Sequence, residues 1–227
     1  MDIVLRPAAA ALRAFRHVTG VGLPDVRPVF ISLPKTGSTS VARMLRSAYW
    51  GQPVLYLPVG GPGRERILQM PKKTFDRFGV YRGYFDVSVA RERVPNPLIF
   101  TFLRDPVERL ISDLYYGAAK IRTQISLEDW RPDGDCNVMT QLLVGSADAE
   151  AAIEALSSMD FVGITERMDS DMPRLLQQLG RPNVAMERKN VNRGRPASDD
   201  LSPRVRSFLR ERTEADRKVY EWALGRG

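Results

Sequence analysis

The chain has 227 residues, a length typical of one globular domain. Its composition, 43% hydrophobic and 27% charged, excludes wholesale disorder and a protein that spans a membrane many times. The formal charge of +7 favours an anionic ligand or surface without choosing among them. A single cysteine, Cys136, and a single histidine, His17, exclude an intrachain disulfide and multi-cysteine or multi-histidine metal sites. They favour a reducing, cytoplasmic location, with Cys136 buried.

Residues 1–24 are expected to form a helical extension, and residues 25–227 the main domain. Apolar residues at near-helical spacing predict an amphipathic helix that docks on the domain: Ala8, Leu12, Phe15 and, less regularly, Val18. Attachment of this helix to a membrane surface stays open as an alternative. Because arginines interrupt the apolar run, neither a secretory signal nor a transmembrane segment is expected.

Strands and helices then alternate along the chain. Short apolar runs predict strands at 29–33, 54–57, 79–82, 97–103 and 161–164. Helical spacing predicts helices at 38–49, from Pro106 onward and at 168–179, with two short helical stretches before Phe78. Such alternation predicts an α/β fold, a single domain with a central parallel sheet flanked by helices.

The C-terminal part begins with a basic segment. Residues 183–200 show no periodicity and are expected to form a long loop that carries Arg188, Lys189, Arg193 and Arg195. Ser202 and Pro203 then predict the N-cap and first turn of one final helix. Its apolar residues lie on or near one face: Val205, Phe208, Leu209, Val219 and Trp222.

The loop after the first predicted strand has the residues of an anion site. It reads Pro-Lys-Thr-Gly-Ser-Thr-Ser over 34–40. Gly37 permits a tight turn, and the amides that follow it lie at a helix N-terminus, which favours negative charge. Lys35 adds a cation, and three hydroxyls add donors: Ser38, Thr39 and Ser40. A phosphate would fit in this loop.

The order of these residues differs from that of a nucleoside-triphosphate loop. There the lysine follows a second glycine and precedes a hydroxyl that binds magnesium, whereas Lys35 precedes Gly37. A kinase or ATPase thereby loses its main support. The strand at 97–103 ends at Arg104, and Ser112 lies about two helical turns further on, a spacing that suits one more phosphate.

The helix that begins at Pro106 also carries residues with structural interpretations. Asp105 is predicted to be its N-cap. Arg109 is expected to form a surface ion pair, and Tyr115 and Tyr116 are expected to pack within the fold.

Together, segments 34–40 and 102–112 resemble the two donor-binding motifs of sulfotransferases that use 3′-phosphoadenosine 5′-phosphosulfate (PAPS). The resemblance is greatest to carbohydrate sulfotransferases of the heparan-sulfate 2-O type and their bacterial relatives. Segments 137–145 and 161–167 extend it, so that it covers residues 30 to about 220. It implies a P-loop-like sulfotransferase fold and in-line transfer of sulfonate from PAPS to a hydroxyl of a carbohydrate or glycoconjugate, with no metal.

The resemblance also implies roles for individual residues. The loop from Lys35 to Ser40, with Thr36 and Gly37, would hold the 5′-phosphosulfate, and Lys35 would stabilise the bridging oxygen as sulfonate leaves. Arg104 and Ser112 would bind the 3′-phosphate. In this family an aperiodic segment near the C-terminus covers the nucleotide, and Arg193 and Arg195 are the candidates here.

The catalytic base departs from the family pattern. Many relatives place a catalytic histidine after a glycine between the two motifs, but here Tyr84 follows Gly83. A tyrosine with its ordinary pKa of about 10 is a poor base at neutral pH. Either Asp86 removes the acceptor proton, or the acceptor is itself acidic. Asp86 and Tyr84 are therefore the candidate catalytic residues beside Lys35, with Glu65 and His17 behind them and a further, unidentified base left open.

Two functions of other classes stay open. One is a non-catalytic nucleotide-binding module, which the missing histidine favours; the other is a phosphoryl-transfer enzyme with a variant loop, which the lysine placement opposes. Nucleic acid is not an expected partner, because the basic residues are dispersed and carry no known nucleic-acid-binding signature. The acceptor would bind the loops at 51–71 and 120–135, which show no decisive chemistry.

Overall fold

The computed structural model describes residues 2–19, 22–121, 126, 136–182, 184 and 196–226. A five-stranded sheet lies at its centre, with all neighbouring strands parallel and the order β2-β3-β1-β4-β5. The strands are β1 (Arg27–Ile31), β2 (Val54–Leu57), β3 (Val80–Gly83), β4 (Pro97–Leu103) and β5 (Phe161–Ile164). Each overlaps a predicted strand, and the predicted α/β class with a central parallel sheet is confirmed.

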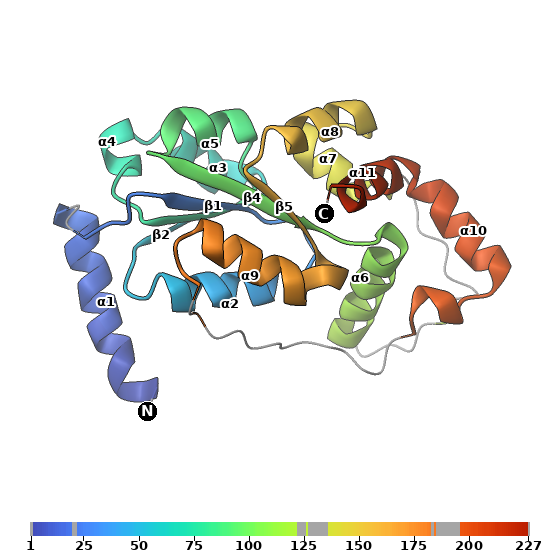
Figure 1. Ribbon diagram of the computed structural model, residues 1–227, viewed down its shortest axis with the longest axis horizontal. Helices are drawn as coiled ribbons and strands as arrows, with labels where there is room; N and C mark the ends of the chain where they lie inside the picture. The colour runs from blue at the N-terminus through green and yellow to red at the C-terminus, as the bar shows by residue number, and fades with distance from the viewer. Residues whose placement is uncertain are drawn as a thin grey trace.

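Helices cover both faces of the sheet (Figure 1). One face carries α2 (Ser38–Ala48) and α9 (Met168–Gln178). The other carries α3 (Gly61–Leu68), α4 (Lys72–Phe75), α5 (Val87–Arg93), α7 (Val138–Val144) and α8 (Ala149–Ser157). At opposite ends of the molecule lie α1 (Asp2–Thr19) and the pair α10 (Pro203–Arg212) and α6 (Pro106–Ile121). The last helix is α11 (Glu214–Leu224), and the turns η1 (Thr165–Arg167) and η2 (Ser198–Asp200) complete the fold. Helices α5, α7 and α8 go beyond the predicted elements.

Strand β4 shows why the strand sequences are almost entirely apolar. Ile99 and Leu103 pack in the core under α5 and α8, while Phe100 and Phe102 pack on the other face with α2 and α9. Every residue from Leu98 to Leu103 is therefore buried. A strand that is covered on both faces reads as a continuous apolar run instead of an alternating one.

The predicted final helix is wrong in one respect, because α10 and α11 are separate helices that break at Thr213. The Thr213 hydroxyl donates to the Leu209 carbonyl at 2.9 Å. Buried Asp216, in the first turn of α11, accepts hydrogen bonds from the amides of Met139 at 3.1 Å and Thr140 at 2.7 Å. These bonds hold α11 against α7 and away from the direction of α10.

The surface ion pair expected for Arg109 is also wrong. Its side chain is 1% exposed, and the Asp113 carboxylate lies 4.0 Å away. Burial lowers the pKa of Arg109, and the nearby carboxylates of Asp216 and Asp113 oppose that shift. Because Asp216 belongs to α11, Arg109 is enclosed where α6 packs against α11. The same region buries Cys136, as predicted.

The N-cap of α8 offers a test of local stability. Asp148 precedes the helix, and its carboxylate accepts a hydrogen bond from the Ala151 amide at 3.0 Å. An Asp148→Ala protein is expected to lose about 1 kcal/mol of unfolding free energy in urea titrations, because that amide loses its partner. Asp148→Asn keeps a capping oxygen and serves as the control. Equal losses in both variants would show that the cap itself does not stabilise the helix.

Candidate functional site

The candidate site lies where the chain leaves two adjacent central strands. β1 pairs with β4, and the carboxyl ends of both strands lie at one edge of the parallel sheet. After β1 the chain continues to β2 on one side of the sheet order, and after β4 it continues to β5 on the other. Ligands of open α/β sheets bind at such a divergence, outside the carboxyl ends of the strands.

The loop after β1 has an unusual backbone. Lys35 has a φ of 66° and Gly37 a φ of 77°, both in the left-handed region. A lysine in this conformation is uncommon, and residues held in sparsely populated conformations cluster at functional sites. Left-handed residues next to a helix N-terminus also direct successive amides toward one point, which makes an anion-binding concavity. The backbone therefore supports the anion site predicted for this loop.

The loop is anchored on both sides. Thr36 is fully buried, and its hydroxyl donates to the Leu33 carbonyl at 3.0 Å. The Thr36 hydroxyl therefore fixes the loop to the end of β1 and is not available to a ligand. A Cβ atom at position 37 would lie 2.4 Å from the Cε of Met168, the first residue of α9, so the end of that flexible side chain would have to move. The left-handed φ of Gly37 is what favours glycine here.

The start of α2 has no side-chain cap within the described part of the chain. Gly37 is the N-cap residue, and no side chain of the described residues accepts a hydrogen bond from the first amides of α2. Ser38 lies inside the helix, so it is not the cap. Ser38 and Ser40 are half-buried and Thr39 is exposed. The Ser40 amide donates to the Gly37 carbonyl at 2.9 Å. The amides of Ser38 and Thr39 and the three hydroxyls lie at the positive end of the helix dipole.

Arg104 joins the two predicted motifs. Its guanidinium donates to the Lys35 carbonyl at 3.0 Å and forms ion pairs with Glu108 at 3.6 Å and Glu166 at 3.7 Å. The Arg104 side chain is 15% exposed, so it is held in place by these partners while its edge still reaches solvent. The structure therefore brings Lys35 and Arg104 into one cluster.

Glu166 is a member of this cluster that motif reading did not single out. Its carboxylate accepts hydrogen bonds from the Asp105 amide at 3.3 Å and the Tyr220 hydroxyl at 3.2 Å. Burial raises the pKa of Glu166, while Arg104 and the Asp105 amide oppose that rise. The available signal was its position two residues after the end of β5, at the same edge of the sheet as Arg104.

Tyr116 is a second residue of the site that sequence reasoning placed elsewhere. The ammonium of Lys35 lies 3.7 Å from the centre of the Tyr116 ring, and the tyrosine is 53% exposed. Tyr116 therefore does not pack in the core as expected; it forms a cation–π contact with the loop lysine. A contact of this kind keeps Lys35 beside the loop without removing its charge.

Tyr84 and Asp86 lie at the end of the next strand, β3. The Ser32 amide donates to the Gly83 carbonyl at 2.8 Å, which ties the end of β3 to the end of β1. Gly83 has a φ of 125°, and a Cβ atom there would lie 2.1 Å from the Leu57 carbonyl oxygen, so only glycine fits. Both candidate bases therefore stand at the carboxyl edge, next to the strand that leads to Lys35.

The surroundings of these two candidates differ. Asp86 is 54% exposed and forms an ion pair with Arg64 at 2.9 Å. Arg64 also donates to the Tyr84 carbonyl. Burial raises the pKa of the Tyr84 phenol, and nearby Tyr56 adds to the rise, so Tyr84 is protonated at neutral pH. The carboxylate of Asp86 is thus the better proton acceptor of the two.

The other residues predicted for the site lie on different elements. Ser112 is half-buried in α6, and Glu65 is exposed on α3. His17 packs against the ring of Phe78 at 4.7 Å, and Phe78 precedes β3, at the amino edge of the sheet. His17 is therefore not placed as a base. Arg193 and Arg195 lie outside the described residues.

The described residues contain no group of three or more His, Cys, Asp or Glu residues that could hold a metal ion. None of the described helices is long and apolar enough to cross a membrane.

Comparisons with known proteins give few matches. No protein-family model matches the chain, and no curated protein matches it. Among solved structures, the chain is similar to a sulfotransferase from Alicyclobacillus acidocaldarius, with a TM-score of 0.49 and 15% sequence identity. The likeness covers 90% of this chain and 97% of that one. At this identity the residues of the site have to carry any functional proposal.

Glu166 allows a test of how the carboxylates tune Arg104. A Glu166→Gln protein keeps an oxygen for the Asp105 amide but loses a charge that competes with phosphate for Arg104. We expect it to bind 3′,5′-adenosine bisphosphate about fivefold more tightly than wild type at about pH 8, because one negative charge that repels the phosphate is removed.

The same pair of proteins gives a pH dependence. Because burial raises the pKa of Glu166, the wild-type carboxylate becomes neutral at a higher pH than an ordinary glutamate does. The ratio of the two dissociation constants should therefore fall toward one as the pH is lowered. Calorimetric titrations of both proteins at each pH measure it. A ratio that does not change with pH would contradict a role for Glu166 in setting the affinity.

Proposed function

We propose that the protein is a sulfotransferase that moves a sulfonate group from PAPS to a hydroxyl acceptor. The observation that carries the proposal is the hydrogen bond of the Arg104 guanidinium to the Lys35 carbonyl, which unites two anion-binding loops at one edge of the sheet. A nucleotide with phosphates at both its 3′ and 5′ positions needs two such loops. The similarity to the Alicyclobacillus acidocaldarius structure is not used to choose these residues.

Each loop has a distinct role in this proposal. The amides at the start of α2 and the hydroxyls of residues 38–40 hold the 5′-phosphosulfate, and Lys35 neutralises the negative charge that develops on the bridging oxygen as the S–O bond breaks. Arg104 and Ser112 bind the 3′-phosphate, and Arg193 and Arg195 cover the nucleotide. The sulfonate passes to the acceptor oxygen by in-line displacement. These cations supply the neutralisation that magnesium supplies in phosphoryl transfer, so the mechanism uses no metal.

The acceptor must lose its proton during the transfer, and Asp86 is the residue proposed to take it. Asp86 lies two residues after Tyr84, at the carboxyl end of the strand that neighbours β1. Its ion pair with Arg64 fixes the direction of the carboxylate. The protonated Tyr84 hydroxyl would donate to the acceptor instead of removing its proton.

The acceptor proposed is a carbohydrate or glycoconjugate. β2 lies beside β3, and Tyr56 on β2 is 49% exposed with the Arg82 guanidinium 5.1 Å from its ring centre. The ring and the guanidinium form an exposed, flat and polar surface near Tyr84, of the kind that binds a sugar ring. A location in the cytoplasm is proposed from the single cysteine alone.

Turnover assays distinguish this function from its alternatives. The protein is incubated with PAPS and a panel of sugars, glycans and phenols, and transfer of labelled sulfonate is measured with and without magnesium. Transfer to a sugar that needs no magnesium supports the proposal. Binding of the donor without transfer to any acceptor would favour a non-catalytic nucleotide-binding module. Magnesium-dependent hydrolysis of ATP would favour a phosphoryl-transfer enzyme.

A further inference from the structure

The outer edge of β5 is a feature that the proposed function does not use. β5 is the last strand in the sheet order, so no strand of the described residues pairs with its outer edge. A cavity of about 140 Å³ runs along this edge and is lined by four of the five residues from Asp160 to Ile164. A hollow that follows consecutive strand residues has the shape of an extended segment.

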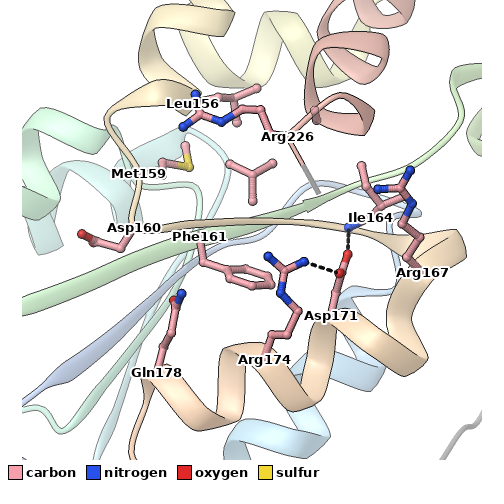
Figure 2. A pocket seen from close by; sticks show the side chains of 12 residues that line it. Leu156, Met159, Asp160, Phe161, Ile164, Arg167, Asp171, Arg174, Gln178 and Arg226 are labelled. Atoms are coloured by element: carbon pink, nitrogen blue, oxygen red, sulfur yellow. Dashed lines mark hydrogen bonds and ion pairs between the residues drawn. The ribbon is translucent and has the colours of Figure 1, made fainter.

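The two sides of this edge differ in chemistry. Buried Leu156, Met159 and Ala223 form an apolar wall on the side of α8 and α11. Arg174 and Gln178, both on α9, lie on the opposite side, as Figure 2 shows. Side chains of a strand point alternately to the two faces of its sheet. The cavity therefore suits a strand in which apolar and polar side chains alternate.

The charge of the cavity selects acidic side chains. Three arginines line it, Arg167, Arg174 and Arg226, against two carboxylates, Asp160 and Asp171. Asp160 already accepts hydrogen bonds from the Ile99 amide at 2.7 Å and from Arg91 at 3.0 Å. The charge of Asp160 is therefore already compensated by partners within the protein.

Asp171 also defines where an added strand would end. Its carboxylate accepts a hydrogen bond from the Ile164 amide at 2.8 Å and lies 3.4 Å from a nitrogen of Arg174 (Figure 2). The amide of Ile164 is therefore already paired, and an added strand would bond to residues 161–163. The Arg174 side chain is 56% exposed, and its guanidinium also lies 6.0 Å from the centre of the Phe161 ring.

We propose that the outer edge of β5 binds an extended acidic segment of a partner protein, which adds to the sheet as a further strand. Main-chain hydrogen bonds to β5 supply affinity, and alternate acidic and apolar side chains supply specificity. The acidic side chains pair with Arg174 on the α9 side, and the apolar ones contact the wall of Leu156, Met159 and Ala223. Arg226 lies on the side of that wall (Figure 2), where its positive charge adds to the attraction for an acidic segment. A second copy of this chain is a poorer occupant, because pairing of two β5 edges would bring the arginines of both copies to one seam.

A labelled peptide tests the proposal on the full chain. The probe is a fluorescein-labelled peptide amide of sequence Asp-Val-Glu-Val-Asp, and fluorescence anisotropy measures its binding. We expect saturable binding that weakens at least tenfold in Arg174→Glu and in Arg226→Glu. Arg204→Glu, an exposed change on α10, is the matched control and should bind as wild type does. Circular dichroism checks that each variant is folded, and Arg226→Glu decides the outcome if Arg174→Glu does not fold.

Two altered peptides separate strand addition from simple charge attraction. A peptide with proline at its centre lacks one amide donor and should bind at least tenfold more weakly. A peptide of sequence Lys-Val-Lys-Val-Lys should bind Arg174→Glu better than wild type. Equal affinity for the proline peptide, unchanged binding by both charge-reversed arginines, or full displacement of the probe by succinate would overturn the proposal. A wild-type dimer in sedimentation that Arg174→Glu dissociates would also overturn it, in favour of self-pairing.

Discussion

Lys35→Ala is expected to lower the rate of sulfonate transfer about a thousandfold, the loss seen when a preorganised group that stabilises developing charge is removed. The reason is that Lys35 is the cation of the loop that would face the bridging oxygen of the donor. Its left-handed backbone and its contact with Tyr116 already hold it at the loop without a ligand. Single-turnover assays with saturating PAPS measure this loss separately from donor binding.

Two controls belong to this experiment. Lys72→Ala removes a lysine that is 62% exposed on α4 and should leave turnover unchanged. Lys35→Arg restores the charge with a different shape, and partial recovery is expected because the loop recognises an anion by position as well as by charge. Turnover in Lys35→Ala within threefold of wild type would remove Lys35 from the mechanism.

Asp86→Asn is expected to lower turnover about a hundredfold, as loss of a general base does. The asparagine keeps the size of the side chain and can still contact Arg64, but it cannot take a proton. Tyr84→Phe should lower turnover much less, because burial keeps the Tyr84 phenol protonated at neutral pH and so prevents it from acting as the base. The ratio of the two losses, measured at saturating donor with one acceptor, assigns the base.

The opposite order would change the mechanism. A larger loss in Tyr84→Phe than in Asp86→Asn would make the tyrosine hydroxyl the group that acts on the acceptor. Near-wild-type turnover in both variants would point to an acceptor that is acidic enough to need no base.

The sheet could be predicted from the sequence because each strand is a short apolar run. Five short apolar runs separated by helices leave few arrangements other than a parallel sheet, and residues of β4 are buried on both faces as their continuous apolar run indicated. The break between α10 and α11 could not be predicted this way. The break is accompanied by hydrogen bonds from the amides of Met139 and Thr140 to Asp216. Residues 139 and 140 lie far from α11 in the sequence, so no local pattern reveals these bonds.

Some residues of the candidate site could be predicted from the sequence and others could not. Lys35 and Arg104 could be found because each follows a strand whose carboxyl end lies at the same edge of the sheet. Glu166 and Tyr116 could not be assigned, because a carboxylate and a tyrosine reveal their roles only by what they contact. Glu166 contacts Arg104, and Tyr116 contacts Lys35. Sequence motifs therefore identify the basic residues of the site more readily than the residues that contact them.

The most direct test of the central claim is a calorimetric titration of the protein with 3′,5′-adenosine bisphosphate, the nucleotide left after PAPS gives up its sulfonate. We predict one site per chain with micromolar affinity in wild type. In Arg104→Ala the affinity should fall about a hundredfold, as the loss of charge-assisted hydrogen bonds to a phosphate implies. No binding to wild type at millimolar nucleotide, or wild-type affinity in Arg104→Ala, would contradict the account.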